Sequence, residues 1–105
     1  MTEADVLNGV VSGLRCTFQV ERVILFGSRA RNCARPDSDY DILAVVKSDI
    51  PYRLRQGVAR AAVEEDAPVE MDLLVLTPEE LALASTRFDS VARMTIDEGR
   101  VIYAA

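Results

Sequence analysis

Histidine is absent from this chain of 105 residues, and its absence excludes several reaction classes. Without an imidazole there can be no Ser–His–Asp or Cys–His pair, no histidine general base and no histidine-liganded zinc. Lysine occurs once, at Lys47, and no phosphate-binding P-loop pattern is present. Any chemistry must therefore depend on carboxylates, arginines, hydroxyls, thiols and backbone amides.

Cysteine and long apolar runs are also scarce. Cys16 and Cys33 lie far apart, outside any metal-binding or redox spacing, and we interpret them as reduced thiols of a cytoplasmic protein. The acidic amino-terminal segment lacks the apolar stretch of a signal peptide. The longest apolar runs, 42–46 and 73–76, are too short to cross a bilayer. The sequence thus predicts a cytoplasmic protein without membrane contact.

The length and charge of the chain limit what it can be. Residues 1–105 are enough for one domain and little else. The net charge of −5 argues against direct nucleic-acid binding by broad phosphate neutralisation. All but one of the 12 basic residues are arginines, which favours planar contacts with carboxylates or phosphates. The same preference is equally typical of a GC-rich genome.

The apolar periodicity predicts alternating helices and strands. Apolar residues from Val6 to Phe18 recur at helical spacing, with Thr2 or Asp5 as the cap. In this helix Gly9 and Gly13 either weaken the structure or let another element approach closely. We expect strands over residues 22–26, 40–46, 69–76 and 101–103.

Three further helices are expected between these strands. One begins at Pro51 and carries an apolar stripe, one begins at the capping sequence 77–80, and one covers about 89–98. The stripe of the first consists of Leu54, Val58, Ala61 and Ala62. Together the elements predict an α+β domain with a mixed sheet of three to four strands and helices mainly on one face.

Two short stretches contain the residues suited to chemistry. Gly27 and Ser28 end the first strand in a turn, where backbone amides can approach an anion, although such a turn is usually only a turn. Asp39 and Asp41 begin the second strand and point to the same face, because strand side chains alternate. Such a pair either holds a hard cation such as Mg²⁺ or is an acidic turn in solvent.

A third acidic residue, Asp72, lies within the apolar strand 69–76 and needs a partner there. That partner is either an arginine in a structural ion pair or a metal ion shared with Asp39 and Asp41. Three carboxylates on adjacent strands could hold two divalent ions for in-line displacement at phosphorus. Arg29 and Arg31 lie between the two stretches and could neutralise charge.

The combined pattern resembles the minimal nucleotidyltransferases of the DNA polymerase beta superfamily. The matching residues are Gly27-Ser28-Arg29-Ala30-Arg31-Asn32, Ser38-Asp39-Tyr40-Asp41 and, one helix–strand unit later, Asp72. The resemblance covers nearly the whole chain and is strongest to the MNT antitoxins of HEPN/MNT toxin–antitoxin systems. One departure is Asn32, which stands where that pattern has glycine.

The resemblance implies a function and a role for each matching residue. Asp39, Asp41 and Asp72 would be catalytic and would hold two Mg²⁺ ions, while Gly27, Ser28, Arg29 and Arg31 would bind the nucleotide. The chain would transfer AMP from ATP to a tyrosine of a HEPN ribonuclease toxin encoded nearby, and would form a hetero-oligomer with it. Two alternatives are a non-catalytic antitoxin that neutralises the toxin by direct binding, and an enzyme that modifies a small molecule such as an antibiotic.

Overall fold

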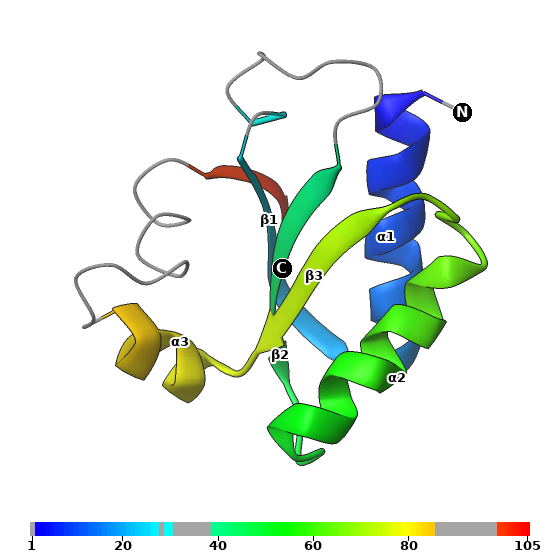
Figure 1. Ribbon diagram of the computed structural model, residues 1–105. Coiled ribbons are helices and arrows are strands. Elements are labelled where there is room, and N and C mark those ends of the chain that lie inside the picture. Colours follow the sequence, from blue (N-terminus) through cyan, green and yellow to red (C-terminus); the bar gives the residue numbers. More distant parts are fainter. Residues whose placement is uncertain (1, 28, 31–38, 86–98) are drawn as a thin grey trace.

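The computed structural model describes residues 2–27, 29–30, 39–85 and 99–105 (Figure 1). In chain order the elements are α1 (Glu3–Thr17), β1 (Gln19–Phe26), β2 (Tyr40–Lys47), α2 (Tyr52–Glu64), β3 (Met71–Leu76), α3 (Pro78–Ser85) and β4 (Arg100–Ala104). This confirms the expected α+β class. The helix predicted over 89–98 lies outside the described residues.

The strands form one mixed sheet in the order β3-β2-β1-β4. β1 pairs antiparallel with both β2 and β4, whereas β2 and β3 are parallel. β2 and β3 therefore begin at the same end of the sheet, with α2 as the connection between them. β3 is an edge strand, which matters for the site described below.

Capping interactions fix the starts of α1 and α3. The Thr2 hydroxyl accepts a hydrogen bond from the Asp5 N–H at 3.1 Å, and the Asp5 carboxylate accepts from the Thr2 N–H at 3.0 Å. At the start of α3 the Thr77 hydroxyl accepts from the Glu80 N–H at 3.3 Å, and the Glu80 carboxylate accepts from the Thr77 N–H at 2.8 Å. The cap of α3 was predicted from the sequence, whereas for α1 the sequence left Thr2 and Asp5 as alternatives, and the structure has Thr2 as the cap with Asp5 as its partner.

Helices cover the two faces of the sheet unequally. Figure 1 shows α1 and α2 on one side and α3 on the other. The larger core lies beneath α1 and α2, and a smaller one forms between the sheet and α3. A Cβ atom at Gly9 or Gly13 would overlap the carbonyl oxygen of Asp66 or Ala62. The glycines of α1 therefore permit a close approach of α2, which was one of the two readings of the sequence.

The apolar stripe predicted for α2 is wrong. Leu54 and Val58 are exposed, at 65% and 38%, whereas Arg55, Ala59 and Val63 are buried. The Arg55 guanidinium donates to the Ile50 carbonyl at 2.9 Å, to the Val75 carbonyl at 3.2 Å and to the Glu80 carboxylate. Burial of the arginine is tolerated because these acceptors satisfy its donors. None of the described helices is long and apolar enough to cross a membrane.

Candidate active site

Asp41 and Asp72 lie side by side where β2 and β3 begin. They are register partners in the parallel pair, so their side chains project from the same face of the sheet. This is the face that carries Leu43 and Leu74 of the smaller core, opposite α1 and α2. We call Asp41 and Asp72 the carboxylate pair.

The environment of the carboxylate pair disfavours two negative charges. Asp41 is half-buried and Asp72 is exposed. Burial raises the pKa of the Asp41 carboxyl, and so do a hydrogen bond from its protonated form to Asp72 and the charges of Asp72 and Asp39. Like-charged oxygens held this close gain from a cation between them.

Asp39 does not complete a three-carboxylate cluster. Its exposed side chain precedes β2 and is near enough to Asp41 to influence its charge. Within the described residues, however, no three acidic, histidine or cysteine side chains gather closely enough to hold a metal ion. The expected convergence of Asp39, Asp41 and Asp72 in one coordination sphere is therefore absent from this structure, because only the last two are aligned by paired strands.

Gly27 brings the first stretch of the resemblance up to the carboxylate pair. β1 ends at Phe26, which is the register partner of Asp41, and the chain turns at Gly27 with φ of +74°. A Cβ atom at Gly27 would overlap the Asp41 carboxylate. Glycine is needed here both for its left-handed backbone and for the absence of a side chain.

Arg29 lies away from the carboxylate pair. Its guanidinium stacks 3.9 Å from the centre of the Tyr40 ring and lies 3.7 Å from Glu3 at the start of α1. Tyr40 belongs to the core beneath α1, so this arginine ties the turn to the opposite face of the sheet. Ser28 and Arg31, both predicted to bind nucleotide, lie outside the described residues.

A groove of ≈ 640 Å³ begins at the carboxylate pair and continues along β3. We call it the β3 groove. It includes residues that the sequence did not single out, and Gly57, a glycine inside a helix, was the one available signal. Its lining consists of Phe26, Asp41, Gln56, Gly57, Arg60, Met71, Asp72, Leu73 and Leu74.

The residues present fit a divalent cation. Carboxylate oxygens are the donors that Mg²⁺ prefers, and the carboxylate pair supplies them from two side chains at one end of the sheet. Burial and the neighbouring acids Asp72 and Asp39 raise the pKa of the Asp41 carboxyl, and a bound cation would offset both effects. The described part of the chain places no ion-pair partner on either carboxylate, so the structural ion pair considered for Asp72 is not observed there.

Comparison with known families and structures agrees with this geometry. The family model of the nucleotidyltransferase domain matches residues 7–102. No curated protein sequence matches the chain significantly.

Several solved structures share the fold at low identity. A toxin–antitoxin structure with AMP-PNP superposes with a TM-score of 0.69 at 20% identity, covering 94% of this chain and 73% of that one. The toxin–antitoxin MntA–HepT superposes with a TM-score of 0.61 at 19% identity, and the match covers 94% of this chain and 70% of that one. The structure of the tri-AMPylated Shewanella oneidensis HEPN toxin in complex with MNT antitoxin superposes with a TM-score of 0.63 at 15% identity. The match covers 99% of this chain and 74% of that one. These neighbours show that the fold is that of the MNT antitoxins.

Proposed function

We propose that this chain, which belongs to the nucleotidyltransferase domain family, is a Mg²⁺-dependent protein adenylyltransferase that transfers AMP from ATP to a tyrosine of a HEPN ribonuclease toxin. The carboxylate pair beside the Gly27 turn is the observation that carries the proposal. The structural neighbours support it, since one is a complex with AMP-PNP and another contains an AMPylated HEPN toxin.

The reaction is a displacement at the α-phosphorus of ATP. The acceptor hydroxyl oxygen forms a bond to that phosphorus, and the bond to the bridging oxygen of the β-phosphate breaks. Pyrophosphate leaves, and the hydroxyl proton passes to a carboxylate, a role that we assign to Asp72 because its exposed side chain lines the groove. Bound Mg²⁺ would neutralise the charge that develops on the phosphate oxygens.

Each residue of the candidate site has a distinct task in this scheme. Asp41 and Asp72 would hold the metal, and Asp39, whose charge already acts on Asp41, would be a further ligand. Gly27 lets the backbone approach the β- and γ-phosphates, with Ser28 beside it and Arg31 neutralising their charge. Arg29 positions the turn through its contacts with Tyr40 and Glu3.

The decisive experiment measures transfer of radiolabelled AMP from α-labelled ATP to the HEPN partner encoded in the neighbouring gene. We expect labelling of the partner with Mg²⁺ and none after chelation with EDTA. Asp41→Asn and Asp72→Asn should each lower the rate by at least about 100-fold, because each removes a metal ligand. Asp49→Asn is the matched control, since Asp49 is an exposed acid just beyond the opposite end of β2.

Two results would overturn the proposal. One is equal labelling by wild type and by the Asp41→Asn and Asp72→Asn variants. The other is full neutralisation of the toxin in cells by both variants, which would favour neutralisation by direct binding. Mass spectrometry of the modified partner identifies the acceptor side chain, and a residue other than tyrosine would correct that part of the proposal.

A further inference from the structure

The backbone of edge strand β3 offers one set of outward-facing polar groups to the β3 groove. The Glu70 carbonyl accepts from the Tyr40 N–H at 3.3 Å, so the backbone of Glu70 and of every second residue after it faces β2. The backbone groups of Met71, Leu73 and Val75 therefore face away from the sheet. An edge of this kind can pair with another extended chain unless it is covered.

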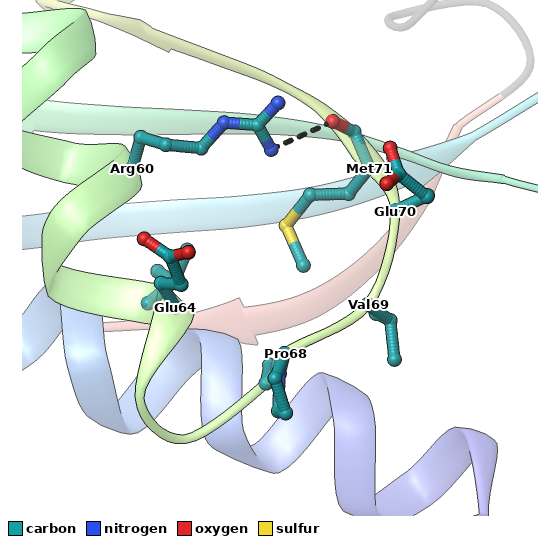
Figure 2. A pocket seen from close by; sticks show the side chains of 8 residues that line it. Arg60, Glu64, Pro68, Val69, Glu70 and Met71 are labelled. Atoms are coloured by element: carbon teal, nitrogen blue, oxygen red, sulfur yellow. Dashed lines mark hydrogen bonds between the residues drawn. The ribbon is translucent and has the colours of Figure 1, made fainter.

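Side chains of α2 cover two of these three positions. Gln56 accepts from the Val75 N–H at 2.8 Å and donates to the Val75 carbonyl at 2.7 Å. Arg60 donates to the Met71 carbonyl at 3.0 Å, as Figure 2 shows. Between them, no side chain of the described residues bonds to the N–H or C=O of Leu73.

The helix also leaves space at the uncovered position. Gly57 lies between the two covering residues in the sequence of α2 and lines the same groove as Leu73. A Cβ atom at Gly57 would meet nothing within 4 Å. Helix packing therefore does not require this glycine, unlike Gly9 and Gly13, whose positions are filled by the backbone of the segment 62–66.

We propose that the β3 groove binds an extended segment of the acceptor protein, which hydrogen-bonds to the N–H and C=O of Leu73. This inference rests on the proposed transfer to a protein. Leu73 presents one donor and one acceptor in strand geometry, which is the arrangement that the backbone of an extended peptide complements. The groove is continuous with the carboxylate pair, so a side chain of the bound segment can bring its hydroxyl to Asp72.

The walls of the groove agree with this occupant. Phe26, Met71 and Leu74 give it apolar walls, against which the ring of a tyrosine can pack. The lining of the groove combines these apolar side chains with the carboxylates of Asp41 and Asp72, which repel a phosphate that carries no metal ion. We therefore favour a peptide segment over the polyphosphate of the nucleotide in this part of the site.

The test is the variant Gly57→Leu, which adds a side chain to a residue that lines the groove and whose new Cβ would meet no atom of the fold within 4 Å. We expect kcat/KM for the HEPN partner to fall by about tenfold or more, mainly through KM. Binding of Mg²⁺ and ATP, measured by calorimetry without the partner, should be unchanged. The control Val58→Leu introduces the same side chain one residue later, at an exposed position outside the groove.

A second variant, Leu73→Pro, removes the outward N–H while the ladder bonds to β2, made by Asp72 and Leu74, remain. It should also raise KM for the partner. If both variants transfer AMP to the partner like wild type, the acceptor segment does not bind here and the inference fails. That failure is distinct from failure of the proposed function, in which wild type itself transfers no AMP to the partner.

Discussion

Replacing Gly27 by alanine should damage the site more than the fold. The left-handed conformation at φ of +74° costs an L-residue about 1–2 kcal/mol. The new Cβ would also overlap the Asp41 carboxylate, which must rotate away. For a domain of this size each kcal/mol lowers the melting temperature by roughly 4–8 °C. We therefore expect a folded variant with a visibly lower melting temperature.

The effect on transfer should be larger. A displacement of about 1 Å at a catalytic group can cost about 100-fold in rate, and the overlap with a Cβ at residue 27 would displace the carboxylate of Asp41, the proposed metal ligand. Thermal melts and labelled-AMP transfer measure the two effects on the same sample. Gly57→Ala is the stability control, because its Cβ meets nothing and should stabilise the helix by about 0.5–1 kcal/mol. An unchanged melting temperature and transfer rate for Gly27→Ala would refute the reasoning.

Two further predictions concern the packing that holds the site. The Arg55 guanidinium holds the pKa of the Glu80 carboxyl below its ordinary value of 4.5, so this pair stabilises the fold at neutral pH and the contribution is lost as the pH falls through the lowered pKa. Glu80→Gln should therefore lower the free energy of unfolding, measured by urea denaturation at pH 7, by about 1–2 kcal/mol. The difference from wild type should vanish in acid, and a difference that does not depend on pH would contradict this. Gly13→Ala should lower the free energy of unfolding by about 1–3 kcal/mol, because the new Cβ would overlap the backbone of Ala62 and α1 would have to move. A melting temperature equal to that of wild type would contradict this and show that α1 and α2 can move apart at no cost.

Local signals made much of the fold predictable. Thr77 with Glu80 identified the start of α3, because the partners of this cap are three residues apart, and the start of α1 was located by Thr2 or Asp5 as the alternative caps. The strand from Tyr40 was equally clear, since its apolar run is bounded by polar residues. The start of β1 at Gln19 was missed because a register shift between Val20 and Arg22 interrupts the alternation of side chains.

Contacts between distant segments could not be predicted in the same way. Arg55 was not placed in the core because its partners, Val75 and Glu80, lie 20 and 25 residues away. For the candidate site, alternation suggested that Asp39 and Asp41 share a face and left Asp72 as one possible partner, and the structure aligns Asp41 with Asp72. Their alignment depends on the β2–β3 register, which a single sequence does not encode locally.

That register makes the chemistry depend on one peripheral strand. A slip of β3 by a single residue would turn Asp72 to the opposite face and separate it from Asp41. Among the described strands β3 pairs with β2 alone, so a local opening of β3 would leave the pairing of β1 with β2 and β4 intact. In the proposed mechanism such a partial and reversible opening would stop the transfer, so a loss of activity on heating or in denaturant should precede global unfolding.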